Sequence, residues 1–193
     1  AMAVSQEALD RQLRLLAEEG FHAVPAQELI DYVYHGASLP EKPVFITFDD
    51  GYYSNYSLAG PLLEKYGLNA TVFSIGSSMG HMEYYKDTGH PITPLFGYGE
   101  AREMQRTGVI DVQSHTYDMH QRPQTGGVSG REGVLKKEGE SAEDYRDALL
   151  EDFEQYCRRR EGRVSTPLTA LSYPFGLCSG ETDRVLEEAG AVL

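Results

Sequence analysis

Two adjacent acidic residues, Asp49 and Asp50, follow an apolar stretch of the sequence and precede Gly51. Alone, the pair is a weak indication of function, because Asp-Gly is a common turn dipeptide and Asp50 could simply cap a following helix. Two neighbouring carboxylates at the end of a buried strand nevertheless repel each other, and a cation or a shared proton must relieve that repulsion. A metal ion would bind one carboxylate and leave the other free to act as a base.

Two histidines, His115 and His120, stand five positions apart just after a second apolar stretch. On a helix this offset places side chains about 140° apart, and on a strand it places them on opposite faces. Neither regular element would let both imidazoles reach one ion, whereas a loop that curls after a strand would. The competing interpretation is a pair of exposed, unrelated loop histidines.

The two patterns together predict a catalytic metal centre. Two neutral imidazoles and one carboxylate form the open three-ligand set typical of catalytic zinc, with the remaining positions left for water and substrate. One of the two carboxylates would hold the ion together with His115 and His120, and the other carboxylate would accept a proton from water. We expect Zn²⁺, and the same ligands also suit Co²⁺ or Ni²⁺.

Short apolar stretches alternate with helical patterns, which indicates an α/β fold. Two long loops, 76–99 and 115–140, each follow an expected strand, and such loops carry the chemistry in barrels. The stretch 44–48 is apolar throughout, as in a parallel strand buried on both faces. The other strands are expected at 21–24, 70–75, 109–114 and 169–173, with a strand-like 191–193. Helices are expected at about 5–20, 100–107, 141–160 and 181–189. Two more are expected, one after Pro25 that contains Leu29, Ile30 and Val33, and one that passes through Leu62 and Leu63 and ends at Tyr66.

Three segments together resemble a known family. They are Thr47-Phe48-Asp49-Asp50-Gly51, His115-Thr116 with His120, and Ser172-Tyr173-Pro174-Phe175-Gly176. In order and in framing strands they are similar to the first three motifs of the polysaccharide deacetylases, the NodB-homology group or carbohydrate esterase family four. The resemblance extends from Ser5 to the end. It implies one domain, residues 1–193, with a distorted (β/α) barrel that is incomplete at its termini.

The resemblance also implies an activity and a role for each motif residue. The activity is metal-dependent hydrolysis of N-acetyl groups on a glycan that contains N-acetylglucosamine, such as peptidoglycan or an exopolysaccharide, at the cell surface or outside the cell. By position, Asp49 would be the general base, and Asp50, His115 and His120 would be the metal ligands. Thr116 would brace the histidine loop. The backbone N–H of Phe175 would bind the oxyanion, and Tyr173 and Pro174 would line the substrate groove. Core packing is an equal alternative for Tyr173 and Phe175.

This sequence departs from the family pattern in two places. The third motif usually begins with an arginine that orients the base, and Ser172 stands there instead. The family's later Leu-x-His motif, which supplies the general acid, is not found, and no histidine follows His120. His81 and His90, in the first long loop, could reach the site, although a solvated loop role is the simpler interpretation. A catalytically weak glycan-binding domain, or a deacetylase or esterase for another acetylated substrate, therefore stays open.

Composition excludes several classes of protein. The net charge of −13 and the lack of a basic patch exclude a nucleic-acid partner. No apolar run approaches the roughly 18 residues of a membrane helix, and the first residues do not resemble a signal peptide. Two cysteines, Cys157 and Cys178, do not form a disulfide framework. The sequence leaves the oligomeric state open.

Overall fold

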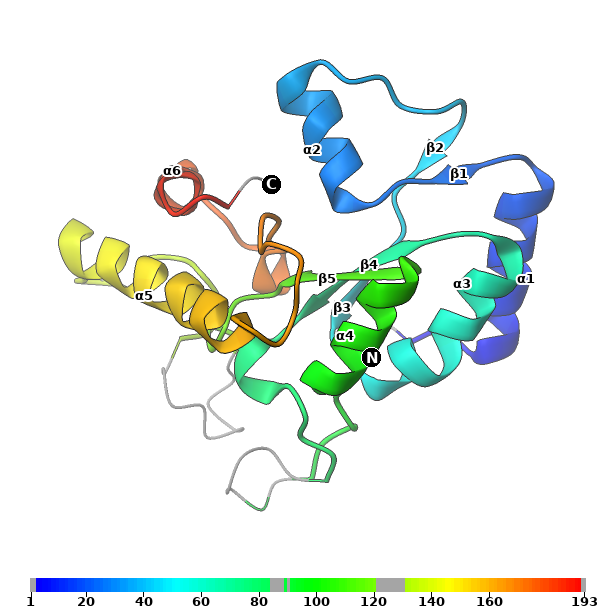
Figure 1. Ribbon diagram of the computed structural model, residues 1–193. Helices are drawn as coiled ribbons and strands as arrows, with labels where there is room; N and C mark the ends of the chain where they lie inside the picture. Colours follow the sequence, from blue (N-terminus) through cyan, green and yellow to red (C-terminus); the bar gives the residue numbers. More distant parts are fainter. Residues whose placement is uncertain (1–2, 84–88, 90, 121–130, 192–193) are drawn as a thin grey trace.

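A three-stranded parallel sheet forms the centre of the protein (Figure 1). The computed structural model describes residues 3–83, 89, 91–120 and 131–191. The strands are β3 (Thr47–Asp50), β4 (Ala70–Ser74) and β5 (Ile110–Ser114), in the order β3-β4-β5. The register pairs Asp50 with Ser74 and Ser74 with Ser114. The carboxyl ends of the strands are therefore level, so that segments leaving them emerge side by side.

Three helices pack against one face of this sheet: α1 (Gln6–Glu18), α3 (Gly60–Tyr66) and α4 (Tyr98–Thr107) (Figure 1). One π-helical turn, η1 (Asn55–Ala59), leads directly into α3. Buried apolar side chains from the helices and strands pack together in the largest core cluster, which includes Leu13, Leu62, Leu63, Val72, Met104, Ile110 and Val112. Burial of this apolar surface is the main force that fixes the helices on the sheet.

The opposite face of β4 is covered by α2 (Ala26–His35). Phe73 points to this side and packs with Ala26 and Ile30 of the helix. The short strands β1 (His22–Ala23) and β2 (Pro43–Val44) flank α2 in sequence and pair in parallel (Figure 1). Phe73 and its neighbour Val72 thus face opposite ways, and β4 is buried at all five of its positions.

The expectation of one strand over 44–48, buried on both faces, is wrong. The segment is divided between β2 and β3, which belong to different sheets. Thr47 is exposed and Phe48 only half-buried. Within the described residues β3 lies at the edge of its sheet, whereas the central strand β4 has a neighbour on each side. The apolar run marks the approach to the sheet correctly but does not distinguish an edge strand from a central one.

Two further helices, α5 (Ala142–Arg160) and α6 (Gly180–Glu188), contact each other beyond β5. Ser141 begins α5 as expected, since its hydroxyl accepts a hydrogen bond from the Asp144 N–H at 3.0 Å. The single-turn 3₁₀ helices η2 (Gly76–Ser78) and η4 (Pro174–Gly176) lie in the connections. No helix in the described ranges is both long and apolar enough to cross a membrane. Both cysteines are free.

The strand expected at 169–173 does not form. It is reduced to a single parallel bridge between Leu171 and Ser114. The cause is that two side chains bind backbone groups that would otherwise form strand-to-strand hydrogen bonds. The Gln113 side-chain oxygen accepts the N–H groups of Thr169 and Ala170 at 2.9 and 3.0 Å, and Arg160 donates to the Val112 carbonyl at 2.7 Å. The strand-like end at 191–193 lies largely outside the described residues.

Candidate functional site

Asp50, His115 and His120 converge at the carboxyl ends of β3 and β5. One ligand atom from each lies within 4.8 Å of the other two. Asp50 Oδ1 is 3.7 Å from His115 Nε2 and 3.6 Å from His120 Nε2. The two imidazole rings lie 4.9 Å apart between centroids. The loop therefore does curl so that both histidines reach one carboxylate.

The tautomer of His115 follows from its surroundings. Its Nδ1 lies 2.8 Å from the backbone carbonyl of Ser172. A carbonyl can only accept, so Nδ1 must carry the hydrogen and donate it. In the neutral ring, Nε2 then presents a lone pair towards Asp50. This arrangement, a backbone acceptor behind a histidine, is the one that orients metal-binding imidazoles.

The three side chains fit a small divalent ion. Two ligands held at about 2.1 Å from an ion with tetrahedral geometry are about 3.4 Å apart, close to the observed 3.6 and 3.7 Å. The alternative is that Asp50 forms ion pairs with two imidazolium rings. That would place two adjacent cations, one of them on the buried His115 ring, against a single carboxylate. A metal ion bound by neutral imidazoles avoids this repulsion.

The backbone between the histidines is held at nearly every position. Thr116 accepts a hydrogen bond from the Met119 N–H through its Oγ1 at 3.2 Å, and its own N–H donates to Ser114 Oγ at 3.0 Å. Its carbonyl accepts the Gly76 N–H at 3.0 Å. Gly76 is required here, because a Cβ at this position would lie 2.7 Å from the Tyr117 ring. The loop is therefore closely packed against the start of η2.

Asp49 is exposed and stands outside the group of three ligand atoms. Its Oδ1 lies 3.4 Å from Ser172 Oγ, the residue that replaces the family's arginine. Ser172 thus contacts Asp49 through its hydroxyl and His115 through its carbonyl. In the sequence, Ser172 is recognisable only as the position where the family's arginine is missing. Its two contacts, with Asp49 and His115, are visible only in the structure.

The third motif lies beside the histidines. The ring of Phe175 packs 4.5 Å from that of His120 between centroids, and Phe175 has a positive φ of 62°. Pro174 is buried. The Tyr173 hydroxyl donates to Asp183 in α6 at 2.6 Å, and burial followed by this hydrogen bond raises the pKa of Tyr173. Tyr173 packs against two core clusters, so its role at a substrate groove stays a prediction.

Asp152 is a residue of this region that sequence reasoning missed. Its two carboxylate oxygens accept the N–H groups of Tyr117 and Asp118, between the two histidines. A signal was present: Asp152 lies three residues after Leu149 and four before Tyr156, on the buried stripe of α5. An acid on an apolar stripe needs hydrogen-bond partners.

For the two other histidines considered as acids, that role stays a prediction. His81 Nδ1 lies 2.8 Å from the backbone carbonyl of Ser78, and His81 is not one of the three clustered ligands. His90 lies outside the described residues. The position of a general acid is therefore unassigned.

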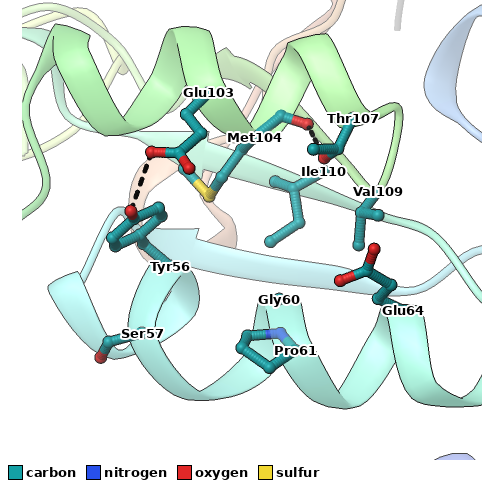
Figure 2. Close-up of a pocket in the computed structure, with 10 residues that line it drawn as sticks. All are labelled: Tyr56, Ser57, Gly60, Pro61, Glu64, Glu103, Met104, Thr107, Val109 and Ile110. Atoms are coloured by element: carbon teal, nitrogen blue, oxygen red, sulfur yellow. Dashed lines mark hydrogen bonds between the residues drawn. The ribbon is translucent and has the colours of Figure 1, made fainter.

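A hollow of about 290 Å³ lies elsewhere, between the segment 56–64 and α4 (Figure 2). Its floor is apolar, with Met104 and Ile110, while Glu64 and Glu103 stand at its rim (Figure 2). Tyr56 donates a hydrogen bond to Glu103 at 2.9 Å. None of the motif residues lines this pocket, so its size does not make it the site of the chemistry.

Comparison with known proteins identifies relatives over nearly the whole chain. A family model described as polysaccharide deacetylase matches residues 36–193. Putative polysaccharide deacetylase YxkH of Bacillus subtilis (strain 168) is 26% identical over 190 residues, which are 98% of this chain and 57% of that protein. The poly-β-1,6-N-acetyl-D-glucosamine N-deacetylase of Staphylococcus aureus (strain MRSA252) is 25% identical over 97% of this chain and 59% of its own length. The chain thus spans somewhat more than half of these relatives.

Solved structures give the same result. IcaB from Ammonifex degensii superposes with a TM-score of 0.78 at 27% identity, over 98% of this chain and 74% of that one. A de-N-acetylase from Aggregatibacter actinomycetemcomitans has a TM-score of 0.78 at 22% identity, over 97% and 76%, and shows the fold alone. The expected α/β class with the parallel strands of a (β/α) barrel is confirmed, although the barrel is not closed within the described residues.

Proposed function

We propose that this chain, which belongs to the polysaccharide deacetylase family, is a metal-dependent hydrolase. It removes N-acetyl groups from a glycan containing N-acetylglucosamine. The observation that carries the proposal is the convergence of Asp50, His115 and His120 on one point, with the His115 ring oriented by the Ser172 carbonyl behind it. These three residues would hold a divalent ion, for which we expect Zn²⁺, with Co²⁺ or Ni²⁺ as alternatives.

The chain's residues would divide the reaction between them. When bound, the ion supplies positive charge that polarises the acyl oxygen and lowers the pKa of water towards 7. Asp49 accepts the proton that water loses as its oxygen attacks the acyl carbon, and Ser172 helps to orient Asp49. The backbone N–H of Phe175 donates to the negatively charged oxygen that develops on the substrate. Cleavage of the carbon–nitrogen bond then gives acetate and a glucosamine unit, whose nitrogen takes up a proton.

The substrate class rests on likeness to relatives. The Staphylococcus aureus relative is by its name a poly-β-1,6-N-acetyl-D-glucosamine N-deacetylase. We propose the same class of N-acetylated polymer for this chain, and action at the cell surface or outside the cell. Peptidoglycan and exopolysaccharide are both within the proposal, and a panel of oligomers from each would separate them.

Metal content and acetate release test this function together. The purified protein should bind one zinc ion per chain and release acetate from N-acetylglucosamine oligomers. Both properties should be lost on chelation, and acetate release should return when zinc is added. His115→Ala should lose the ion, whereas Glu103→Gln, in the remote pocket, should keep both properties. A protein that carries no ion after incubation with zinc, or a His115→Ala variant that binds zinc as well as the wild type, would contradict the site.

A further inference from the structure

We propose that Asp152 of α5 is a positioning residue for the metal site, holding the backbone between His115 and His120 in the shape that aims both imidazoles at one ion. This inference rests on the proposed function, because it assumes that the two histidines bind metal. It adds a residue that lies in none of the three motifs and that acts only through the loop.

The contact is made by both oxygens of one carboxylate. Asp152 Oδ2 accepts the Tyr117 N–H at 2.7 Å, and Oδ1 accepts the Asp118 N–H at 2.8 Å. Hydrogen bonds to an ionised acceptor are shorter and stronger than neutral ones, and two parallel bonds also fix direction. The pair of bonds therefore fixes the orientation of two successive peptide groups in the middle of the loop.

The neighbouring peptide groups of the loop are held by other parts of the chain. The Thr116 and Met119 N–H groups are bound by hydroxyls that lie two and three residues away in the sequence, those of Ser114 and Thr116. The Thr116 and Tyr117 carbonyls accept from Gly76 and Ser77, next to β4. Asp152 connects the Tyr117 and Asp118 N–H groups to α5, a separate element more than 30 residues further along the chain.

The geometry of the ligands explains why such a tie matters. A spacing of five residues places two side chains on one ion only if the loop departs from regular structure, as the φ of 67° at Thr116 shows. Asp118 and Met119 lead directly to His120, so a shift of their peptide groups would move that ring away from Asp50 Oδ1, which is now 3.6 Å distant. His115 has a second constraint, the Ser172 carbonyl.

The test is zinc affinity, measured by competition with a chelator, in the wild type and in Asp152→Ala, Asp152→Asn and Asp152→Glu. Alanine removes both acceptors, and asparagine keeps one oxygen but turns an NH₂ group towards the other N–H. Glutamate keeps both oxygens on a longer stem. We expect zinc binding to weaken about 10- to 100-fold in Asp152→Ala, less in Asp152→Asn and least in Asp152→Glu, as for other groups that orient metal ligands.

Two control variants separate positioning from stability. Leu63→Ala creates a cavity in the core beneath α3 and should lower the melting temperature without weakening zinc binding. Asp147→Asn removes an exposed carboxylate from the same helix and should change neither. If the wild type binds zinc and the Asp152 variants bind it equally well while losing stability, Asp152 is a structural residue only and the proposed function stands. A wild type that binds no zinc would overturn both.

Discussion

At the scale of single residues, the candidate site is where the backbone takes its least favourable conformations. Four non-glycine residues among those described have a positive φ, and three of them are Asp50, Thr116 and Phe175, at 69°, 67° and 62°. Such a conformation costs on the order of 1 kcal/mol for an L residue and persists only where the surroundings fix it. Here it lies in each of the three motifs, which is consistent with side chains and N–H groups being held for function.

Asp49 and Asp50 should prove separable although they are neighbours. In Asp49→Asn the side chain keeps its size but cannot accept a proton, so zinc should stay bound and deacetylation should fall at least ~100-fold. In Asp50→Asn a ligand loses its charge, so zinc binding itself should weaken. Metal analysis and acetate release on the same preparations would measure both effects. Equal loss of zinc in the two variants would show that the carboxylates do not have different roles.

Residue patterns predicted that Asp50, His115 and His120 lie together, because the constraint was local. Histidines five positions apart reach one ion neither on a helix nor on a strand, and a carboxylate pair after a strand needs a cation or a shared proton. Ser172 and Asp152 were not predicted as contacts, because each meets its partner across a long separation, 57 residues for Ser172 with His115 and 35 for Asp152 with Tyr117. Which backbone group a side chain reaches over that distance depends on how the helices pack.

At the scale of elements, helix ends were predicted more reliably than strand pairing. Ser5 and Ser141 begin α1 and α5 with the expected caps, since a hydroxyl three residues before an N–H is a local feature. The strand at 169–173 failed because side chains of Gln113 and Arg160 satisfy the backbone groups that a ladder would have used. Apolar periodicity carries no information about such substitutions.

Asp152 of α5 also makes the free energy of unfolding depend on pH. Burial raises the pKa of Asp152 from its usual 3.8 to about 6, although the hydrogen bonds from the Asp118 and Tyr117 N–H groups lower it. The negative charge of the Asp118 side chain adds to the increase, and the positive charge of Arg131 opposes it. The folded protein therefore binds this proton more tightly than the unfolded chain. The protonated Asp152 carboxyl therefore adds about 3 kcal/mol to the free energy of unfolding below about pH 4, and this contribution is lost as the pH rises through 6.

Urea unfolding between pH 4 and 7, with a chelator present, would measure this effect. The free energy of unfolding of the wild type minus that of Asp152→Asn should decrease across the window, because asparagine does not titrate. The same difference taken with Asp147→Asn should change little, since Asp147 is exposed. A difference for Asp152 that is flat above pH 4.5 would mean that this carboxyl has its ordinary pKa.

At the scale of the whole molecule, the site exists because the parallel strands end level. Asp50 closes β3 and His115 follows β5, and the intervening β4 sets the distance between them through its pairing with both. Gly51 allows this close fit, since a Cβ there would lie 2.8 Å from the Cβ of Ser74. The sheet thus brings together groups that are far apart in the sequence, while α5 and the segment after β5 support them from the other side.

The supply of a proton to the leaving group is the remaining step, and it predicts a substrate preference for this chain. An amine must be protonated as it departs, and loss of a positioned acid typically costs ~10²–10⁴-fold. No histidine follows His120 in this sequence. Aryl acetates release a phenolate that needs little protonation. Relative to the uncatalysed rates, we expect aryl acetate hydrolysis to be accelerated at least ~100-fold more than deacetylation of an N-acetylglucosamine oligomer.

Both rates would be measured on the zinc-loaded chain, with His115→Ala as the background. A version extended beyond residue 193, if it supplies an acid, should raise the amide rate and leave the ester rate nearly unchanged. Equal acceleration of amide and ester by the 193-residue chain would contradict the prediction. An acid would then have to lie within the sequence itself, and His81→Ala and His90→Ala would be the first variants to test, because only the variant that removes the acid should slow the amide while sparing the ester.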